Sequence, residues 1–241
     1  MGQQVKVYRD LQFLGNASRN PNISGNPNPD KMCVSYEFTE LALDNTNKYT
    51  PYLDTTSTVA LGSGGVLLTT AATDTKTCTQ TQGGIWWYPA KNCIVEMKFR
   101  IDVITNVAIY AGFSDAVSEA SSLLPFELVT ATLTDTCTDG AGFLLDTRQT
   151  LAYFNVVNTK NSAGAFTQLA STRVPVAATD LTLRVAIDTS GNARYYWNGE
   201  EVGYKASAVT STTPLIPFFG IRNNNASAHV ATLRYVRLWQ D

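Results

Sequence analysis

The stretch LTLRVAIDTSGNARYYWNGEEVG, residues 181–203, decides the fold class of this chain. Over 181–187 apolar and polar side chains alternate with a period of two, which is typical of a strand with one buried face. The pair Asn198-Gly199 favours a tight hairpin, because both residues readily adopt the left-handed backbone that such a turn needs. The aromatic residues at 195–197 must point alternately to the two faces of their strand. The stretch therefore predicts antiparallel strands, joined by tight turns, with aromatic side chains on both faces.

The same alternation recurs along the rest of the chain. In CIVEMKFRIDV, residues 93–103, six apolar side chains fall on one face and four charged side chains on the other. Further strands are expected at 34–39, 65–70, 107–114, 142–146, 151–157, 193–198, 201–204, 217–222 and 230–239. Only 116–124 predicts a short helical turn. Roughly a dozen short strands predict an all-β chain whose residues 32–241 form a two-sheet antiparallel β-sandwich, or jelly roll.

Length and composition suit one large β-domain and argue against several kinds of partner. The chain has 241 residues, of which 44% are apolar and 10% aromatic, so it can bury a sizeable core. Its formal net charge is -2 and its lysines and arginines do not cluster, which argues against a nucleic acid partner. No apolar run approaches about 18 residues and the start has no secretory signal pattern. We therefore expect no membrane partner and synthesis in a host cytoplasm.

The four cysteines do not form a metal-binding pattern. Cys33, Cys78, Cys93 and Cys137 are far apart in the sequence, and the chain has one histidine, His229. A structural zinc site needs closely spaced ligand pairs, so we expect no zinc and no cofactor. Synthesis in a cytoplasm favours reduced, buried thiols over disulfides.

An N-terminal arm is expected before the sandwich. The segment GNASRNPNISGNPNPDK at 15–31 is rich in asparagine, proline and glycine, which favour turns and extended backbone. We interpret residues 1–31 as an extended arm that docks on another protein, and the alternative is an ordinary first strand followed by a long loop. In the first interpretation, the arm would contact a capsid or a neighbouring subunit through Val5, Val7, Tyr8, Leu11 and Phe13.

The strand pattern resembles a known family. The opening stretch, followed by PFFGIRNNNASAHVATLRYVRLWQD, resembles the C-terminal half of concanavalin A-like lectin/glucanase jelly rolls. The runs VEMKFRIDV and VAIYAGFSDA are similar to the paired strands in the middle of that family. This resemblance implies a fold more than a function. Among these jelly rolls, the chain looks most like those of tailed-phage particles, including proteins that decorate a capsid.

The sequence offers no convincing catalytic group, and we expect a protein that is not an enzyme. Glucanases that share this fold carry an E-x-D-x-x-E strand, and no such string occurs here. Glu96 and Asp102 fall on one strand face, but six residues at ~3.3 Å each place them about 20 Å apart. Glycoside hydrolysis requires two carboxyl groups within about 5 to 9.5 Å. His229 lies in a polar run without a nucleophile motif and is expected to be a surface or subunit-facing histidine.

One acidic segment imitates a calcium loop. Asp135, Asp139 and Asp146 in DTCTDGAGFLLD match part of the spacing, but Cys137 stands where an oxygen ligand is needed. We expect a loop followed by a strand and no metal, with calcium at the three aspartates as the alternative.

Two aromatic groups are candidate contact sites. Trp86, Trp87 and Tyr88 are consecutive, so alternation turns at least one of them away from the core, toward a capsid or a subunit. Trp87 and Trp197 are also candidates for stacking against a glycan.

These features together predict a non-enzymatic virion structural protein. As a capsid decoration or cement protein, it would lie on the capsid exterior, bind the major capsid protein and stabilise the shell. Repeated placement on a symmetric shell favours a homo-oligomer, and we favour a trimer. The alternative is a carbohydrate-binding, lectin-like module of a phage fibre or capsid that contacts host glycans.

Overall fold

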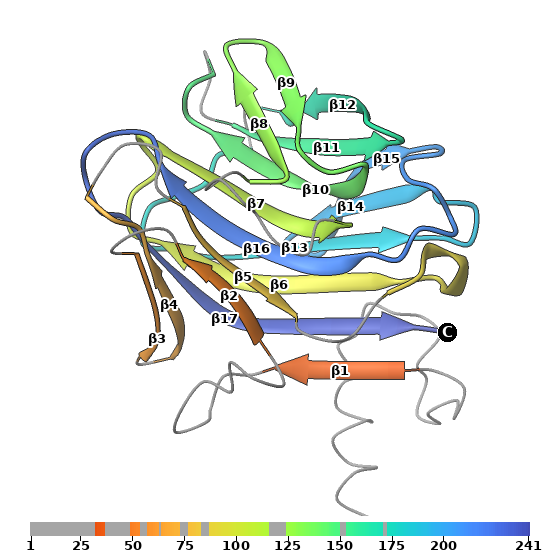
Figure 1. Cartoon of the computed structure of the whole chain (residues 1–241), viewed down its shortest axis with the longest axis horizontal. Coiled ribbons are helices and arrows are strands. Elements are labelled where there is room, and N and C mark those ends of the chain that lie inside the picture. Colours follow the sequence, from red (N-terminus) through yellow and green to blue (C-terminus); the bar gives the residue numbers. More distant parts are fainter. Residues whose placement is uncertain are drawn as a thin grey trace, which may run out of the picture.

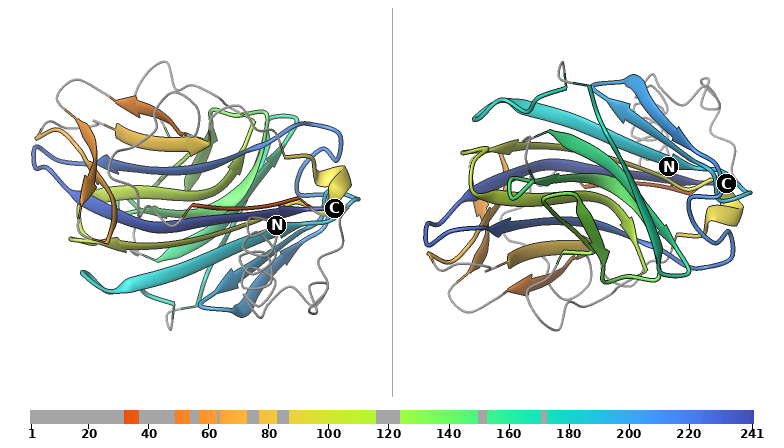
Figure 2. Two further views of the ribbon diagram at one scale, coloured as in Figure 1. Left: turned by 90° about the horizontal axis from the view of Figure 1, so that it is seen from below. Right: turned by 90° about the horizontal axis from the view of Figure 1, so that it is seen from above.

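Two antiparallel β-sheets stacked face to face form the body of the molecule (Figures 1 and 2). The structure, a computed structural model, describes residues 32–36, 49–53, 57–62, 64–72, 77–82, 87–115, 124–149, 153–170 and 173–241. The predicted fold class, an all-β antiparallel sandwich, is confirmed. The predicted arm at 1–31 and, except for its last residue, the predicted helical turn at 116–124 lie outside the described residues. No helix in the described ranges is long and apolar enough to cross a membrane.

The first sheet has eight strands and contains the stretch that opened the sequence analysis. In spatial order its strands are β15 (Glu200–Lys205), β14 (Ala193–Trp197), β13 (Asp180–Ile187), β6 (Ile94–Ile101), β17 (Val230–Gln240), β4 (Gly65–Thr69) and β3 (Thr58–Gly62). The eighth, β1 (Met32–Tyr36), also pairs with β17. Because β17 has 11 residues, its first part can pair with β4 while its last part pairs with β1 along the same edge.

The second sheet has seven strands and an additional hairpin beside it. In spatial order its strands are β12 (Ala163–Gln168), β11 (Phe154–Lys160), β10 (Asp139–Asp146), β7 (Val107–Ser114), β16 (Ile216–Asn223), β5 (Thr77–Gln82) and β2 (Tyr49–Leu53). The hairpin consists of β8 (Phe126–Val129) and β9 (Thr132–Asp135), and a 3-10 helix, η1, covers Pro89–Lys91. Strands β2, β3, β5, β8, β9 and β12 were not among the strands predicted from the sequence.

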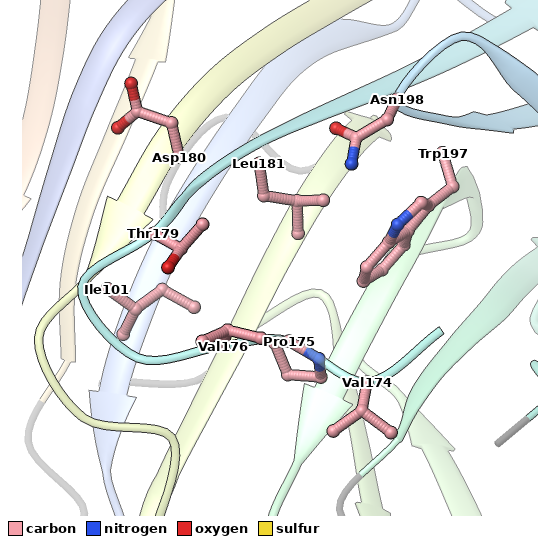
Figure 3. Close-up of a pocket in the computed structure, with 9 residues that line it drawn as sticks. All are labelled: Ile101, Val174, Pro175, Val176, Thr179, Asp180, Leu181, Trp197 and Asn198. Carbon is pink, nitrogen blue, oxygen red and sulfur yellow. The ribbon is translucent and has the colours of Figure 1, made fainter. Parts of the chain in front are cut away.

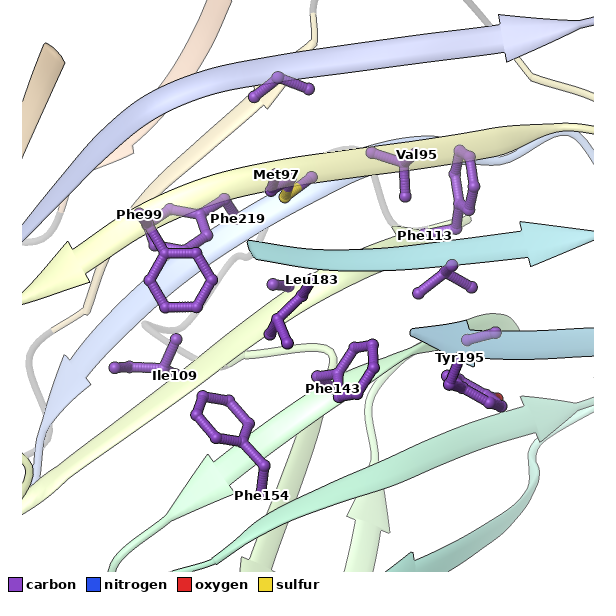
Figure 4. Packing of buried hydrophobic residues seen from close by; sticks show 14 of the residues in the cluster. Val95, Met97, Phe99, Ile109, Phe113, Phe143, Phe154, Leu183, Tyr195 and Phe219 are labelled. Carbon is purple, nitrogen blue, oxygen red and sulfur yellow. The ribbon is translucent and has the colours of Figure 1, made fainter. Parts of the chain in front are cut away.

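The main core lies between the two sheets and is rich in aromatic side chains (Figure 4). Phe99 packs on Phe219 of the opposite sheet with ring centroids 4.9 Å apart, and Phe143 meets Tyr195 edge to face at 5.7 Å. Burial of each such ring stabilises the fold by about 1.5–3 kcal/mol. Tyr195 donates its hydroxyl to the Val157 carbonyl at 3.2 Å, and burial raises the pKa of that hydroxyl.

The predicted alternation at 195–197 is confirmed. Tyr195 and Trp197 point into the core. Tyr196 is half-buried on the outer face, where the guanidinium of Arg184 lies 4.0 Å from the centre of its ring. The Asn198-Gly199 turn has positive φ at both positions, 48° and 90°, as the hairpin interpretation requires.

A second, smaller core lies on the outer face of the seven-stranded sheet. The β8–β9 hairpin stands over this face (Figure 1) and packs Phe126 and Leu128 against Tyr110 and Phe218. The ring of Tyr110 occupies the space above Gly142, where an added Cβ atom would lie 2.5 Å from the ring. Both faces of β7 and β10 are therefore buried, which accounts for their lack of a polar face.

Two of the cysteines bear out the expected chemistry. Cys93 and Cys137 are buried and form no disulfide, and burial raises the pKa of the Cys93 thiol. The side chains of Cys33 and Cys78 lie outside the described part of the chain.

Candidate ligand-binding pocket

The structure brings two carboxylates together on the outer face of the seven-stranded sheet. Glu127 from β8 and Asp146 from β10 form an ionic cluster with Arg148 and with Arg222 from β16. Arg148 Nη2 lies 2.9 Å from Glu127 Oε2 and 2.6 Å from Asp146 Oδ2. Arg222 pairs with Glu127, and its Nη2 lies 3.5 Å from Asp146 Oδ2. The ionic cluster thus joins the hairpin to the sheet.

The chemistry of the ionic cluster is that of a structural contact. Asp146 has no exposed surface and also accepts hydrogen bonds from the Leu128 N–H and the Asn224 amide, both at 3.2 Å. Burial lowers the pKa of Arg222, whereas for Arg148 the bonds to the two carboxylates outweigh burial and raise the pKa. Both carboxylates are therefore held by guanidinium groups.

A small pocket opens at the end of the eight-stranded sheet, where β13 begins and β14 ends (Figure 3). Its volume is about 100 Å³. Most of its lining is apolar, and the lining residues are Ile101, Val174, Pro175, Val176, Thr179, Asp180, Leu181, Trp197 and Asn198. Val174 and Val176 are exposed at its rim, with 39% and 65% of their surfaces open to solvent.

The polar part of the lining includes two side-chain N–H donors, besides the Thr179 hydroxyl, which donates to the Ala177 carbonyl at 3.4 Å. Asn198 Oδ1 accepts a hydrogen bond from the Thr182 N–H at 3.0 Å, which fixes the amide so that Nδ2 takes the other direction. Figure 3 shows that the side-chain nitrogens of Asn198 and Trp197 both lie on the pocket side. Neither nitrogen donates a hydrogen bond to any described residue. The pocket therefore has two donors that a ligand could satisfy.

Asp180, the one acidic residue of the lining, does not direct its carboxylate into the pocket. The Asp180 carboxylate points away from it (Figure 3) and lies 3.2 Å from both Lys98 Nζ and Arg234 Nε. Partial burial works to raise the pKa of Asp180, but the bonds from Lys98 and Arg234 outweigh it and lower the pKa. Among its lining residues the pocket therefore offers no carboxylate to a ligand.

Trp197 is the predicted glycan contact that the structure places in a pocket. Only 6% of its surface is exposed, because its ring packs edge to face on Phe154 at 5.4 Å. The residue therefore forms a rigid wall rather than a free stacking platform. Sequence reasoning did not identify Asn198 as a site residue, although its place in the turn directly after Trp197 was a usable signal.

The prediction that Trp87 contacts a partner or a glycan is wrong. Its backbone forms a bridge with Leu215, through hydrogen bonds of 2.7 and 2.8 Å, which directs the indole into the main core with no exposed surface. Tyr88 is 39% exposed and is accessible for contact. Trp86 and the predicted arm contacts, Val5, Val7, Tyr8, Leu11 and Phe13, lie outside the described residues.

The structure separates the three aspartates of the calcium alternative. Asp139 and Asp146 stand at opposite ends of β10, so they cannot share an ion. Asp135 accepts from the Thr159 hydroxyl, Asp139 from the Thr210 N–H, and Asp146 belongs to the ionic cluster. No group of three or more His, Cys, Asp or Glu side chains gathers as a metal site in the part of the chain that the structure describes.

Two other residues considered from the sequence also have structural partners. His229 is buried, with 5% of its surface exposed, because its backbone pairs with Thr70; the prediction of a surface position is wrong. Glu96 is buried as well and accepts the Tyr235 hydroxyl at 3.0 Å. Burial, and to a smaller extent the nearby Glu96 carboxylate, raise the pKa of the Tyr235 hydroxyl to about 12.

Comparisons with known proteins bear on the fold. No protein-family model and no curated protein matches the chain. A laminarinase (endo-1,3-beta-glucanase) catalytic domain from Thermotoga petrophila RKU-1 is similar over 88% of this chain and 98% of its own, with a TM-score of 0.60 and 10% identity. The potassium-bound Emp46p carbohydrate recognition domain is similar over 84% of this chain and 94% of its own, with a TM-score of 0.59 and 12% identity. The Bacillus licheniformis beta-glucanase is similar over 86% of this chain and 97% of its own, with a TM-score of 0.59 and 12% identity.

These similarities show a concanavalin A-like jelly-roll fold, as the sequence resemblance implied. Hydrolases and carbohydrate recognition domains share this fold, so function has to be argued from the site.

Proposed function

We propose that the chain is a non-enzymatic carbohydrate-binding module of a virion, and that it binds its glycan at the pocket beside Trp197 and Asn198. One contrast carries the proposal. The two carboxylates that meet on the outer face of the seven-stranded sheet are paired with arginines, whereas the two pocket donors have no partner among the described residues. Unpartnered donors beside apolar surface suit the recognition of a sugar, which presents acceptor oxygens and C–H faces.

The structural neighbours support carbohydrate as the class of ligand. The structural neighbours include the carbohydrate recognition domains of Emp46p and Emp47p and several glucanases. The first group recognises carbohydrate and the second cleaves it, so both groups bind carbohydrate on this fold. The proposal that this chain binds rather than cleaves rests on its own residues, above all on the arginine pairing of Glu127 and Asp146.

The experiment is a glycan array followed by titration calorimetry with the best ligand. We expect saturable binding that is lost in Val176→Glu, because a charge at the rim would disfavour an apolar sugar face there. Val129→Glu is the matched control, since Val129 is also an exposed valine, with 42% of its surface open, and lies on β8 rather than at the pocket. Equal loss in both variants, or no binding to any glycan, would contradict the proposal.

The non-enzymatic part of the proposal has a separate test. Incubation of the protein with laminarin, mixed-linkage β-glucan and the array ligand should release no reducing ends. Release that is lost on removing Glu127 would overturn this part and would make the ionic cluster a catalytic site.

Capsid decoration is the second function that we propose, and Tyr88 is the observation that favours it. An aromatic side chain that is 39% exposed beside η1 suits a contact with a major capsid protein or with a second copy in a homo-oligomer. Co-sedimentation with capsids should weaken on Tyr88→Ala or on removal of residues 1–14. Unchanged sedimentation of both variants would remove this function.

A further inference from the structure

We infer that the pocket binds the acetamido group of an N-acetylated sugar, with the methyl group on the apolar floor and the carbonyl oxygen accepting from Asn198 Nδ2 and Trp197 Nε1. This inference rests on the proposed carbohydrate-binding function and goes beyond it, because it names the sugar substituent that the pocket selects. Size, apolarity, donor placement and charge each support it.

The size of the pocket suits one substituent and not a whole sugar residue. Its volume is about 100 Å³. Pockets that enclose complete small-molecule ligands measure about 300–1,000 Å³. A glycan would therefore insert one group and leave its rings outside, across the exposed side chain of Val176. Among common sugar substituents, a hydroxyl is too small to fill this space, whereas an acetamido group contributes four heavy atoms.

The floor of the pocket selects an apolar end. Ile101, Pro175 and Leu181 line it together (Figure 3), and their side chains contain no hydrogen-bonding atoms. A hydroxyl group placed against this floor would lose its water without gaining a partner there. A methyl group has no such requirement and gains dispersion contacts with the surrounding carbon atoms.

The donors select an acceptor next to that apolar end. Asn198 Nδ2 and Trp197 Nε1 lie at the pocket on neighbouring residues, and both are held in place, the amide by Thr182 and the indole by Phe154. A carbonyl oxygen has two lone pairs and can accept from both groups at once. An acetyl group carries this oxygen on the carbon next to its methyl group, which matches a donor wall beside an apolar floor.

The charges around the pocket favour a neutral substituent. Asp180 is the one charged residue of the lining, and it is turned away and paired with Lys98 and Arg234. A sugar carboxylate would find no cation among the lining residues, and burying an unpaired charge is costly. An acetamido group therefore fits better than the carboxylate of an acidic sugar.

Saturation-transfer NMR on the full chain tests the inference. The probes are the trisaccharide of N-acetylglucosamine, an oligosaccharide that contains N-acetylgalactosamine, and their glucose and galactose counterparts. We expect the acetyl methyl protons to receive the strongest saturation, and at least one acetylated probe to bind at least tenfold more tightly than its counterpart. Asn198→Asp should remove this preference, because it keeps the acceptor for Thr182 but replaces the donor by a carboxylate oxygen.

The variant and probe sets separate the possible failures. Circular dichroism and the urea midpoint of Asn198→Asp must match the parent, and Val129→Glu is the binding control. Equal binding of acetylated and non-acetylated sugars, lost in Val176→Glu, would overturn the inference and leave the proposed function standing. No binding to any glycan would overturn both. An acetyl preference that survives Asn198→Asp would overturn the assignment to this pocket.

Discussion

Two groups of polar side chains in this molecule differ in how they use their hydrogen-bonding capacity. In the ionic cluster, Glu127 and Asp146 face Arg148 and Arg222, so that two negative and two positive groups compensate each other. In the pocket, the donors of Trp197 and Asn198 face an apolar floor and have no partner among the described residues. The cluster is richer in charge, yet the pocket has more capacity left for a ligand.

Charge density alone therefore does not locate a binding site. Buried charges are tolerated when they pair, and a paired group contributes to the structure that it joins. An unpartnered donor at a solvent-accessible pocket, by contrast, is fixed in direction and still free to bind. The comparison therefore predicts that substitutions in the cluster mainly affect stability, whereas substitutions in the pocket mainly affect binding.

Asp146→Ala should destabilise the protein more than any other substitution considered for the ionic cluster or the pocket. It halves the negative charge that faces Arg222 and Arg148 and removes the acceptor of the buried Leu128 N–H, while Glu127 remains as a partner of Arg222. Breaking a buried ionic network from one side costs about 3–5 kcal/mol. Urea unfolding should show this loss. Glu201→Ala is the control, since its partner Arg194 is exposed, and it should cost less than about 1 kcal/mol. Similar costs for the two variants would contradict the structural role of the ionic cluster.

The elements that could be predicted from the sequence are those whose pattern reflects one buried and one wet face. The strands at Ile94–Ile101 and Asp180–Ile187 alternate in this way and lie in the eight-stranded sheet. The aromatic alternation at 195–197 and the Asn198-Gly199 turn were also predictable, because each depends on local geometry. Trp197, which lines the pocket, was singled out from the sequence on its residue type.

The hairpin and the ionic cluster could not be predicted, because they depend on contacts between distant segments. β8 and β9 have four residues each, too few to show a period. Glu127 and Arg222 are 95 positions apart, and neither residue indicates the other. A charge inside an apolar run, as in IPFFGIRN, was the available signal, since it marks a buried ion that needs a partner. Trp87 was misassigned because alternation turns at least one of three consecutive aromatic residues outward but does not say which one. The bridge to Leu215 directs Trp87 inward, and Tyr88 is the exposed residue.

The next expected effect tests whether the second core holds the hairpin over the sheet. In Gly142→Ala, the added Cβ would meet the Tyr110 ring at 2.5 Å, and Tyr110 is itself fixed by a 2.6 Å hydrogen bond to the Phe113 carbonyl. Such overpacking costs about 1–3 kcal/mol. Gly203→Ala is the matched control, because its Cβ would find its nearest neighbours at 3.5 Å, an ordinary contact. Thermal unfolding should show a lower melting temperature for the first variant alone. Equal melting temperatures for the two variants would mean that the hairpin shifts freely.

A smaller effect should appear in the pH dependence of stability near the pocket. The folded-state pKa of Asp180 is lowered, so its ion pairs with Lys98 and Arg234 contribute stability above the unfolded pKa of about 3.9. This contribution is lost as the pH falls through the lower, folded pKa. Asp180→Asn should therefore flatten the acid limb of a plot of urea midpoint against pH. An unchanged acid limb would show that these partly exposed pairs contribute nothing measurable.

Asn198→Asp should change the stability of the protein least, and it tests most directly whether the pocket and the ionic cluster differ in role. Asn198 has a φ of 48°, which aspartate also tolerates, and its Oδ1 bond to the Thr182 N–H has an equivalent in aspartate. The free energy of unfolding should therefore stay within about 0.5 kcal/mol of the parent. Asn198→Ala, which loses both features, should cost about 1–2 kcal/mol, because alanine disfavours the left-handed backbone. If Asn198→Asp is as destabilising as Asn198→Ala, the amide nitrogen has a structural role, and the pocket no longer differs from the ionic cluster.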